Sequence, residues 1–354
     1  MEAMTEMRLC IWGAGWRTYK FLQEVQSDEL GIYDDEIVGV VDRDQEKWGK
    51  SIVGHRISSP DDVDALPYEK ILICSLPQEK SIRADIEKKY RIKLKDVINF
   101  KEYQSQKVIS YQFAENQKRH TKQKYQGEWQ PFDVNHMVVY TAIIGAYDTL
   151  KDPTVIDDGV RYVCFTDQPD VKSKVWEIHQ IDYDDSISPA LLTRKFKLLP
   201  HCFFPKTKTS VWADASLQIR GSIKSLLSNY QSTSNLLFFP HQERFCIYDE
   251  AAICVLGFVK KMKESIYPQM MKYLSEGFPY NYGLLCGGFM ARNHNDAAVK
   301  KAMEDWYMEV ERFSPRDQLS LPYVLWKHHL DYDLIPYDIY DNPWMKITKH
   351  IFCS

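Results

Sequence analysis

Asp214 is the carboxylate with the clearest chemical setting in this sequence. It directly follows the apolar residues 211–213, small residues come next, and the apolar pattern resumes at Leu217. Open α/β sheets place their ligands and catalytic groups where the strands end. A solvated aspartate in a turn between two strands has the same local pattern. Whether Asp214 does chemistry therefore depends on what lies at the other strand ends.

Two further predicted strands also end in polar residues. The strand that begins at residue 136 breaks at Gly145 and continues into Tyr147 and Asp148. The strand that begins at residue 161 ends at Asp167. Because the carboxyl ends of parallel strands meet at one edge of a sheet, we expect these polar groups to gather beside Asp214.

A predicted helix with two cationic side chains precedes the strand of Asp214. It carries Arg194 and Lys197, which share a face because they are three residues apart, and Pro200 ends it. Carboxylates are hard oxygen ligands for a divalent ion, and Arg and Lys neutralise phosphate charge. A pyrophosphate held by a divalent metal ion, Mn²⁺ or Mg²⁺, would need this combination.

The second half of the chain contains further polar clusters. They are His241, Glu243 and Arg244 after an apolar strand, Arg292 and His294 after a glycine-broken segment, Asp317 and Gln318 at the start of a predicted helix, and Lys346 and His350 near the end. The sequence Ser-Pro-Arg-Asp-Gln around Asp317 is also an ordinary helix start, so a purely structural role explains it as well.

The first 100 residues have the order strand, glycine turn, helix, strand and acid. A buried strand at 7–12 leads to Gly13 and Gly15, a helical pattern follows, and a second strand ends at Asp42. This is the outline of half a dinucleotide-binding fold, whose glycines let a phosphate approach the helix N-terminus. Thr18 stands where the third glycine of that motif belongs, and Asp42 either accepts a ribose hydroxyl or caps its own turn. NAD or another nucleotide is therefore one possible ligand here.

Length and composition divide the chain into two α/β domains and a connector. Residues 1–100 are predicted to form a Rossmann-like domain with a parallel sheet, and a new α/β pattern occupies residues 135–354. Residues 101–134 are rich in Gln, Lys and Tyr and poor in aliphatic residues, which predicts a polar linker with one solvated helix around residues 108–122.

Composition also narrows the possible functions. The net charge of −4, with no dense basic face, gives no reason to expect a nucleic-acid partner. The N-terminus lacks the pattern of a signal peptide and no apolar run has the length of a membrane helix, so we expect a cytoplasmic protein without an integral membrane segment. The eight cysteines are scattered without a CxxC pair, which predicts reduced, mostly buried thiols.

Several motifs of the second half occur together in one known family. Residues 137–345, with TAIIGAYDTL, YVCFTD, SVWADAS, FPHQERFCIYDEA, GLLCGGFMARNHND and PRDQLSLPYVLWK, resemble the TOD1/MUCI70-type glycosyltransferase-like family. The N-terminal motifs IWGAGW, VGVVDRDQEKWG and KILICS resemble the small Rossmann-like domains of bacterial polysaccharide-biosynthesis proteins. The resemblance implies a GT-A-like α/β domain that binds a nucleotide sugar, preceded by a Rossmann-like domain.

The resemblance also implies a reaction and roles for individual residues. The reaction is transfer of a sugar, with a UDP-sugar as the expected donor, to a surface polysaccharide or another glycan or lipid-linked acceptor, with help from a metal ion. Asp214, Ser216 and His350 would hold the metal ion, and Asp317 or Glu243 would be the catalytic base. The nucleotide sugar would be bound by Thr141, Gly145, Tyr147, Asp148, Asp167, Arg194, Lys197, His241 and Arg292.

The sequence keeps other functions open. Ser216 stands where a full DxD motif has its second acid, and serine is a poorer metal ligand than a carboxylate. A metal-independent enzyme and a non-catalytic nucleotide-sugar-binding module are therefore alternatives, and an NAD-dependent sugar-nucleotide oxidoreductase using Gly13 and Gly15 is another. The sequence also leaves open whether the sugar is transferred with inversion or retention, since only inversion requires a carboxylate base, and whether the chain forms a homo-oligomer.

Overall fold

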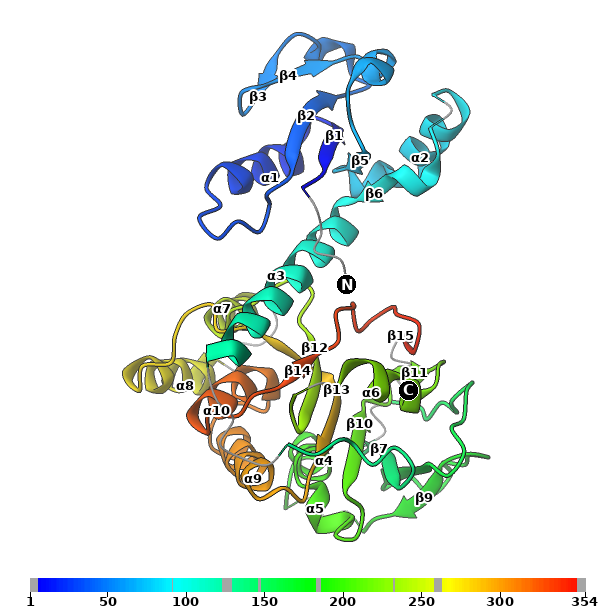
Figure 1. Cartoon of the computed structure of the whole chain (residues 1–354), viewed down its shortest axis with the longest axis vertical. Coiled ribbons are helices and arrows are strands. Elements are labelled where there is room, and N and C mark those ends of the chain that lie inside the picture. The colour runs from blue at the N-terminus through cyan, green and yellow to red at the C-terminus, as the bar shows by residue number, and fades with distance from the viewer. Residues whose placement is uncertain are drawn as a thin grey trace. The chain divides into compact units, whose positions relative to one another are not determined.

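The computed structural model describes residues 6–90, 92–122, 129–145, 148–182, 186–231, 233–257 and 263–348. The chain divides into two units, Met1–Tyr111 and Gln112–Ser354, and each has its own sheet with helices packed against it (Figure 1). Most strand pairs in both sheets are parallel, which confirms the predicted mixed α/β fold class.

The first unit contains a six-stranded sheet. Its strands are β1 (Arg8–Trp12), β2 (Glu36–Val41), β3 (Ser51–Ile52), β4 (His55–Ser58), β5 (Lys70–Ile73) and β6 (Val97–Asn99). Its helices are α1 (Trp16–Gln26) and α2 (Glu79–Lys88), with the short 3₁₀ helices η1 (Gln45–Lys47), η2 (Pro60–Ala65), η3 (Leu76–Gln78) and η4 (Leu94–Asp96). The strand order is β3-β4-β2-β1-β5-β6, and only β3 runs antiparallel to its neighbour.

Both faces of this sheet are buried, as expected for parallel strands that are apolar throughout. Leu9 and Ile11 of β1 pack with Phe21 of α1, whereas Trp12 packs on the opposite face with Ile82 of α2. One helix covers each face because successive side chains of a strand point to opposite sides. The carboxyl ends of β1, β2 and β5 consequently share one edge.

The helix α3 (Phe100–Lys122) occupies most of the segment predicted to be a polar linker. In the first unit it buries Lys107, whose ammonium lies 2.8 Å from Asp35 Oδ1. In the second unit it buries Gln112 and Asn116. The helix thus differs from the solvated one that we expected, because its polar side chains have hydrogen-bonding partners in the two units. The composition of a segment alone does not predict such partners.

The second unit contains a seven-stranded sheet. Its strands are β7 (Met137–Ile143), β8 (Arg161–Thr166), β9 (Glu177–Gln180), β10 (Thr209–Ala213), β12 (Leu236–Pro240), β13 (Leu285–Asn293) and β14 (Asp333–Leu334). The order is β14-β12-β13-β10-β7-β8-β9, and β13 is antiparallel to both of its neighbours while the other pairs are parallel. The strands β7, β8, β10 and β12 therefore all end at the same edge. A separate antiparallel pair consists of β11 (Leu217–Ile219) and β15 (Met345–Ile347).

Helices cover both faces of the second sheet. They are α4 (Pro189–Leu198), α5 (Pro200–Phe203), α6 (Ile223–Tyr230), α7 (Ile247–Gly257), α8 (Lys263–Ser275), α9 (Ala297–Arg312), the 3₁₀ helix η6 (Asp317–Leu319) and α10 (Leu321–Lys327). Phe196 of α4 and Trp306 of α9 pack in the core on one face, together with side chains of α7, α8 and α10. Ile223 and Leu226 of α6 pack on the other face.

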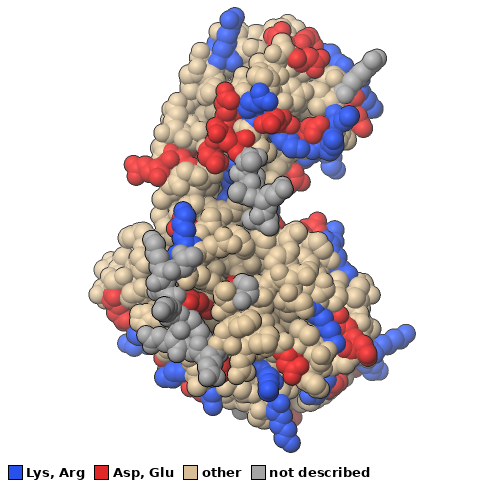
Figure 2. Space-filling view, in the orientation of Figure 1, with Lys and Arg blue, Asp and Glu red and all other residues tan. Residues whose placement is uncertain are grey.

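Three further observations concern the described residues. None of their helices has the length and apolar character needed to cross a membrane. Their seven cysteines are free thiols, and all except Cys202 are buried, which confirms the predicted mostly buried thiols. On the face drawn in Figure 2, Lys and Arg side chains are interspersed with Asp and Glu side chains.

Candidate functional site

The carboxyl ends of β7 and β8 lie together, as their parallel pairing requires. The backbone N–H of Gly145 contacts both carboxylate oxygens of Asp167, at 3.1 and 2.9 Å. Asp148 is buried, and its carboxylate accepts the backbone N–H of Thr149 at 2.8 Å. Tyr147 lies outside the described residues. Gly145 and Asp167 thus contact each other where β7 and β8 end, and their gathering beside Asp214 stays a prediction.

Asp214 follows β10 at the same edge, because β10 runs parallel to β7. The indole N–H of Trp212, two residues earlier, donates to Asp214 Oδ1 at 2.6 Å. The backbone N–H of Asp214 donates to the carbonyl of Gly288 on β13 at 2.8 Å. The side chain of Asp214 nevertheless remains 39% exposed. One carboxylate oxygen is therefore held by the indole, while the carboxylate as a whole is still accessible to a ligand.

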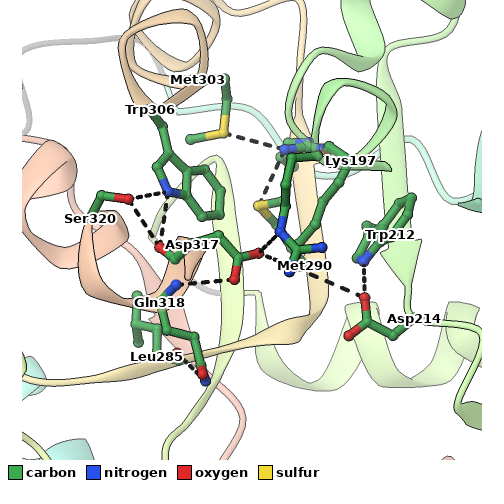
Figure 3. Close-up of polar contacts among 12 residues, drawn as sticks. Lys197, Trp212, Asp214, Leu285, Met290, Met303, Trp306, Asp317, Gln318 and Ser320 are labelled. Carbon is green, nitrogen blue, oxygen red and sulfur yellow. Dashed lines mark hydrogen bonds and ion pairs between the residues drawn. The ribbon is translucent and has the colours of Figure 1, made fainter. Parts of the chain in front are cut away.

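Four charged side chains form an ion network at this edge: Arg194, Lys197, Asp214 and Asp317. The ammonium of Lys197 donates to Asp317 Oδ2 and lies 4.0 Å from Asp214 Oδ1 (Figure 3). Arg194, one turn earlier on α4, has its Nε 3.3 Å from Asp317 Oδ2. The two cations thus share a helix face as predicted, and both are directed to the same carboxylate.

Asp317 is enclosed, and its surroundings keep it ionised. Burial alone would raise the pKa of this carboxyl, but Arg194 and Lys197 outweigh burial and hold the pKa well below its usual range. Its Oδ1 also accepts the backbone N–H of Gln318 at 3.1 Å. A general base needs access to the substrate and a pKa near the working pH. The surroundings of Asp317 therefore fit a carboxylate that stays ionised and paired within the protein better than they fit a general base.

Gly287 and Gly288 of β13 leave the space that the ion network occupies. A Cβ atom on Gly287 would lie 2.9 Å from Lys197 Nζ and 3.2 Å from Asp317 Oδ2. A Cβ atom on Gly288 would lie 3.4 Å from Asp214 Oδ2. The glycine-broken segment of the sequence is therefore the wall against which the charged groups pack.

Arg292, predicted to bind the nucleotide sugar, is fully buried. Its guanidinium donates to the hydroxyl of Tyr140 and the carbonyl of Lys197, and it lies 3.2 Å from the sulfur of Met290 and 3.3 Å from that of Met303. Burial lowers the pKa of this guanidinium. Its contacts fix the C-terminal end of α4, and a direct contact with a donor does not fit its burial.

Thr141 is similarly enclosed within β7. The residue is 1% exposed, and its hydroxyl has no hydrogen-bond partner in the described part of the chain. A buried hydroxyl without a partner is uncommon. At this burial, however, it offers no open surface to a nucleotide sugar.

A loop with the predicted residues His241 and Glu243 follows β12. His241 is buried, and its Nδ1 accepts the backbone N–H groups of Glu243 and Arg244 at 3.2 and 3.1 Å. Burial lowers the pKa of His241 to about 4, so the ring is neutral at neutral pH. Glu243 has a 39% exposed side chain and pairs with Arg244 at 3.1 Å. His241 thus shapes the loop, and Glu243 is its accessible carboxylate.

Glu250 of α7 connects this loop to η6. Its buried carboxylate lies 2.6 Å from Arg244 Nε and 2.8 Å from a terminal nitrogen of Arg316. Burial alone would raise the pKa of Glu250, but Arg316 and Arg244 hold it below its ordinary value. Because Arg316 directly precedes Asp317, Glu250 links the loop of Glu243 to the segment that carries Asp317.

Sequence reasoning missed several of these positioning residues. The position of Trp212 beside Asp214 was predictable, because residues two positions apart on a strand lie on the same face. The contact between Glu250 and Arg316 was not predictable, because the two residues are 66 positions apart and no spacing pattern connects them.

The donor atoms around Asp214 test the predicted metal site. The described residues contain no group of three or more His, Cys, Asp or Glu side chains that could hold a metal ion. Ser216 is buried, and the ammonium of Lys197 already lies 4.0 Å from Asp214 Oδ1. The backbone N–H of Thr348 donates to the carbonyl of Ser216 at 2.8 Å, but His350 lies outside the described residues. The donor set that is described does not fit a divalent ion.

In the first unit, a cavity of about 720 Å³ opens at the carboxyl ends of β1, β2 and β5. Gly13 and Gly15 line it, as predicted for a nucleotide site, and so do the cations Arg17, Arg43 and Lys47. The cavity thus combines a glycine turn with cations, of which Arg43 lies 2.7 Å from Asp85 and Lys47 lies 3.0 Å from Asp42. A glycine turn and cations are features that suit a phosphate group.

Asp42 lines the same cavity, but its carboxylate is engaged within the protein. It accepts the backbone N–H of Ala14 at 2.6 Å, the backbone N–H of Asp44 at 2.8 Å and the ammonium of Lys47 at 3.0 Å. Of the two roles considered for Asp42, the contact with Asp44 supports the cap of its own turn, and the contact with Ala14 ties this turn to the glycine turn.

Comparison with known protein families gives one match within each of the two units. Residues 172–342 match the TOD1/MUCI70, glycosyltransferase-like domain, and residues 5–98 match the C2185-like N-terminal domain. The chain therefore contains a glycosyltransferase-like domain, which includes the whole ion network, preceded by a C2185-like N-terminal domain.

One curated relative and one solved structure illustrate the similarity. The chain is 27% identical over 219 residues to the probable hexosyltransferase MUCI70 of Arabidopsis thaliana, an alignment that covers 53% of this chain and 37% of that protein. UDP-D-quinovosamine 4-dehydrogenase from Vibrio fischeri is 15% identical, with 27% of this chain and 78% of that chain covered. Its TM-score of 0.22 is too low to support an argument about fold or function.

Proposed function

We propose that this protein is a glycosyltransferase that moves a sugar from a nucleotide sugar to an acceptor hydroxyl. The observation that carries the proposal is the ion network of Arg194, Lys197, Asp214 and Asp317, which lies at the carboxyl edge of the sheet and within the matched glycosyltransferase-like region. A departing diphosphate needs fixed cations of this kind. The proposed donor is a UDP-sugar, and the proposed acceptor is a surface polysaccharide or another glycan or lipid-linked hydroxyl.

In this reaction the bond between the anomeric carbon and the phosphate oxygen breaks, and its electron pair leaves with the nucleoside diphosphate. The acceptor oxygen forms the new bond to the anomeric carbon. Arg194 is the more accessible of the two cations, with a side chain that is 25% exposed, against 2% for Lys197. We therefore assign the direct contact with the diphosphate to Arg194.

If transfer inverts the anomeric centre, the acceptor proton has to pass to a carboxylate base. Of the two candidates, Glu243 is favoured by its 39% exposed side chain, whereas Asp317 is buried and its pKa is lowered by two cations. Gly145 and Asp167, at the ends of β7 and β8, are the proposed contacts for the nucleoside, whereas Asp148 is buried.

The cavity of the first unit supports a second proposal, a bound nucleotide or NAD. Its glycine turn and its cations Arg17, Arg43 and Lys47 suit a phosphate group. If that ligand is NAD and it reacts, the protein is a sugar-nucleotide oxidoreductase, and the alternative function predicted from the sequence holds.

A thermal-shift screen of the full-length chain separates these functions. We expect UDP-sugars to raise the melting temperature more than GDP- or CMP-sugars do, because bound ligands stabilise the folded state. Stabilisation by NAD or NADH, with none by any nucleotide sugar, would contradict the transferase proposal.

A pair of variants on α4 tests the assigned contact. Arg194→Ala should remove the shift caused by the UDP-sugar. Lys195→Ala, which removes an exposed cation from the same helix, should keep it. Equal shifts in both variants would exclude Arg194 as the diphosphate contact.

A further inference from the structure

We propose that sugar transfer at this site proceeds without a divalent metal ion, because Lys197 occupies the place between the carboxylates of Asp214 and Asp317 that such an ion would take. The inference rests on the proposed function and deepens it. It starts from the geometry of Lys197, whose ammonium donates to Asp317 and lies 4.0 Å from Asp214 Oδ1 (Figure 3).

The charges of the network are already balanced. Two cations, Arg194 and Lys197, face two carboxylates, Asp214 and Asp317, at the distances of ion pairs. A divalent ion bound to Asp214 would lie next to the ammonium of Lys197, and like charges at such separations repel strongly. The ion would therefore have to displace Lys197 from Asp317, which would leave a buried carboxylate without its closest partner.

Lys197 is held firmly in this place. Its side chain is 2% exposed, its ammonium lies 5.9 Å from the ring centre of Trp212, and a Cβ on Gly287 would already lie 2.9 Å from Nζ. Its own carbonyl is bound by the buried guanidinium of Arg292. Burial of its side chain and the bond to its carbonyl thus hold the lysine at this place.

The remaining oxygen donors near Asp214 are also poorly suited to a metal ion. Trp212 donates to Asp214 Oδ1 at 2.6 Å, which leaves Oδ2 as the oxygen without that bond. Ser216, at the position of the second acid of a DxD motif, is buried and has a neutral hydroxyl. Among the residues that the structure describes, a metal ion at Asp214 would thus find one carboxylate oxygen without a partner from Trp212, where hard cations usually bind several oxygens.

The network itself offers a cation that a departing diphosphate can contact. When the bond between the sugar and the phosphate breaks, the electron pair goes to the nucleoside diphosphate, and Arg194 neutralises the developing charge by direct contact. Lys197 keeps Asp317 paired. No co-reactant beyond donor and acceptor is needed.

The first test is calorimetric titration of the full-length wild-type chain with UDP in EDTA and in Mn²⁺. We expect the two dissociation constants to agree within about twofold, and donor turnover in EDTA to stay within about twofold of that in Mn²⁺. Binding that is about tenfold tighter in Mn²⁺, or turnover that is lost in EDTA and restored by Mn²⁺, overturns the inference but not the proposed function. Failure of UDP and of all nucleotide sugars to bind under either condition overturns both.

A variant gives a readout that does not depend on turnover. Lys197→Ala leaves the carboxylates of Asp214 and Asp317 without the ammonium between them, so we expect it to bind Mn²⁺, measured by the loss of the free Mn²⁺ signal in electron paramagnetic resonance. The wild type and Lys195→Ala should bind none at the same concentrations. Mn²⁺ binding by the wild type, or a folded Lys197→Ala that binds no Mn²⁺, contradicts the inference. If Lys197→Ala does not fold, the wild-type titration decides alone.

Discussion

Lys197 is the residue on which the candidate site depends most directly. It is a buried cation whose closest partner, Asp317, is also buried. Lys197→Met would remove the closest cation from that buried carboxylate, so we expect the free energy of unfolding to fall by about 3–5 kcal/mol. Denaturation in urea measures this change. Lys195→Met, on the same helix but exposed, should change it by no more than about 0.5 kcal/mol, and equal losses in both variants would contradict the buried ion pair.

The lowered pKa of His241 predicts that the stability of the fold depends on pH. Burial lowers its pKa from the ordinary 6.5 to about 4, so between these values the unfolded chain binds a proton that the folded chain does not. The stability due to neutral His241 is complete above pH 6.5 and is lost as the pH falls towards 4, with a slope of about 1.4 kcal/mol per pH unit.

The variant His241→Asn isolates this contribution. An asparagine oxygen can accept the backbone N–H groups of Glu243 and Arg244 in place of Nδ1, but it does not titrate. The free energy of unfolding, measured by urea denaturation, should therefore fall less steeply between pH 6.5 and pH 4 than it does in the wild type. The difference in slope should correspond to about one bound proton. An unchanged slope would show that His241 is not buried as a neutral ring.

Single residues also show where sequence reasoning stops. The strand end at Asp214 and the helix pair Arg194 and Lys197 were predictable, because each depends on local spacing. The burial of Arg292 was not, because its partners include the hydroxyl of Tyr140, which is 152 positions away. A charged residue in a polar motif has the same sequence signal whether it binds a ligand or anchors a helix.

At the scale of elements, α3 contributes directly to the geometry of the second unit. The side-chain amide of Gln112 donates to the carbonyls of His241 and Arg244 at 2.7 and 3.3 Å and accepts the backbone N–H of Leu284 at 2.8 Å. One side chain thus connects the loop of Glu243 to Leu284, the residue directly before β13. This strand contains Gly287 and Gly288. We infer that Gln112 is a positioning residue.

Gln112→Leu tests this role. It removes the contacts while keeping the size of the side chain, so we expect kcat to fall by about tenfold while the affinity for the donor changes little. Asn116→Leu is the matched control, because Asn116 lies one turn further on, is also buried and donates to the carbonyl of Tyr332 at 2.8 Å. It should cost similar stability and leave kcat unchanged. If both variants lose kcat in proportion to stability, Gln112 is merely structural.

The elements themselves were largely predictable. Apolar runs bounded by polar residues identify β7, β8 and β10, and Ser188 and Pro189 mark the start of α4 by capping and by a fixed backbone angle. The antiparallel direction of β13 between β10 and β12 was not predictable, because pairing between strands so distant in sequence leaves no local pattern. That direction brings Gly287 and Gly288 to the ion network.

At the scale of the whole molecule, two units predict two thermal transitions. Differential scanning calorimetry of the full-length chain should show UDP raising one transition and NAD, or another nucleotide, raising the other, because each ligand stabilises the unit that binds it. Arg43→Ala should remove only the NAD shift, and Arg56→Ala, whose side chain is exposed on β4 and does not line the cavity, should keep it. A shift of one and the same transition by both ligands would contradict two separate sites.

The most direct test of the account is the release of UDP from UDP-sugars by the full-length wild type and by Asp214→Asn. The asparagine keeps an acceptor for the indole of Trp212 but removes the charge at the end of β10. We predict turnover in the wild type and a loss of about 100-fold or more in the variant, with the fold unchanged. Turnover in Asp214→Asn equal to that of the wild type would contradict a transferase site centred on the ion network.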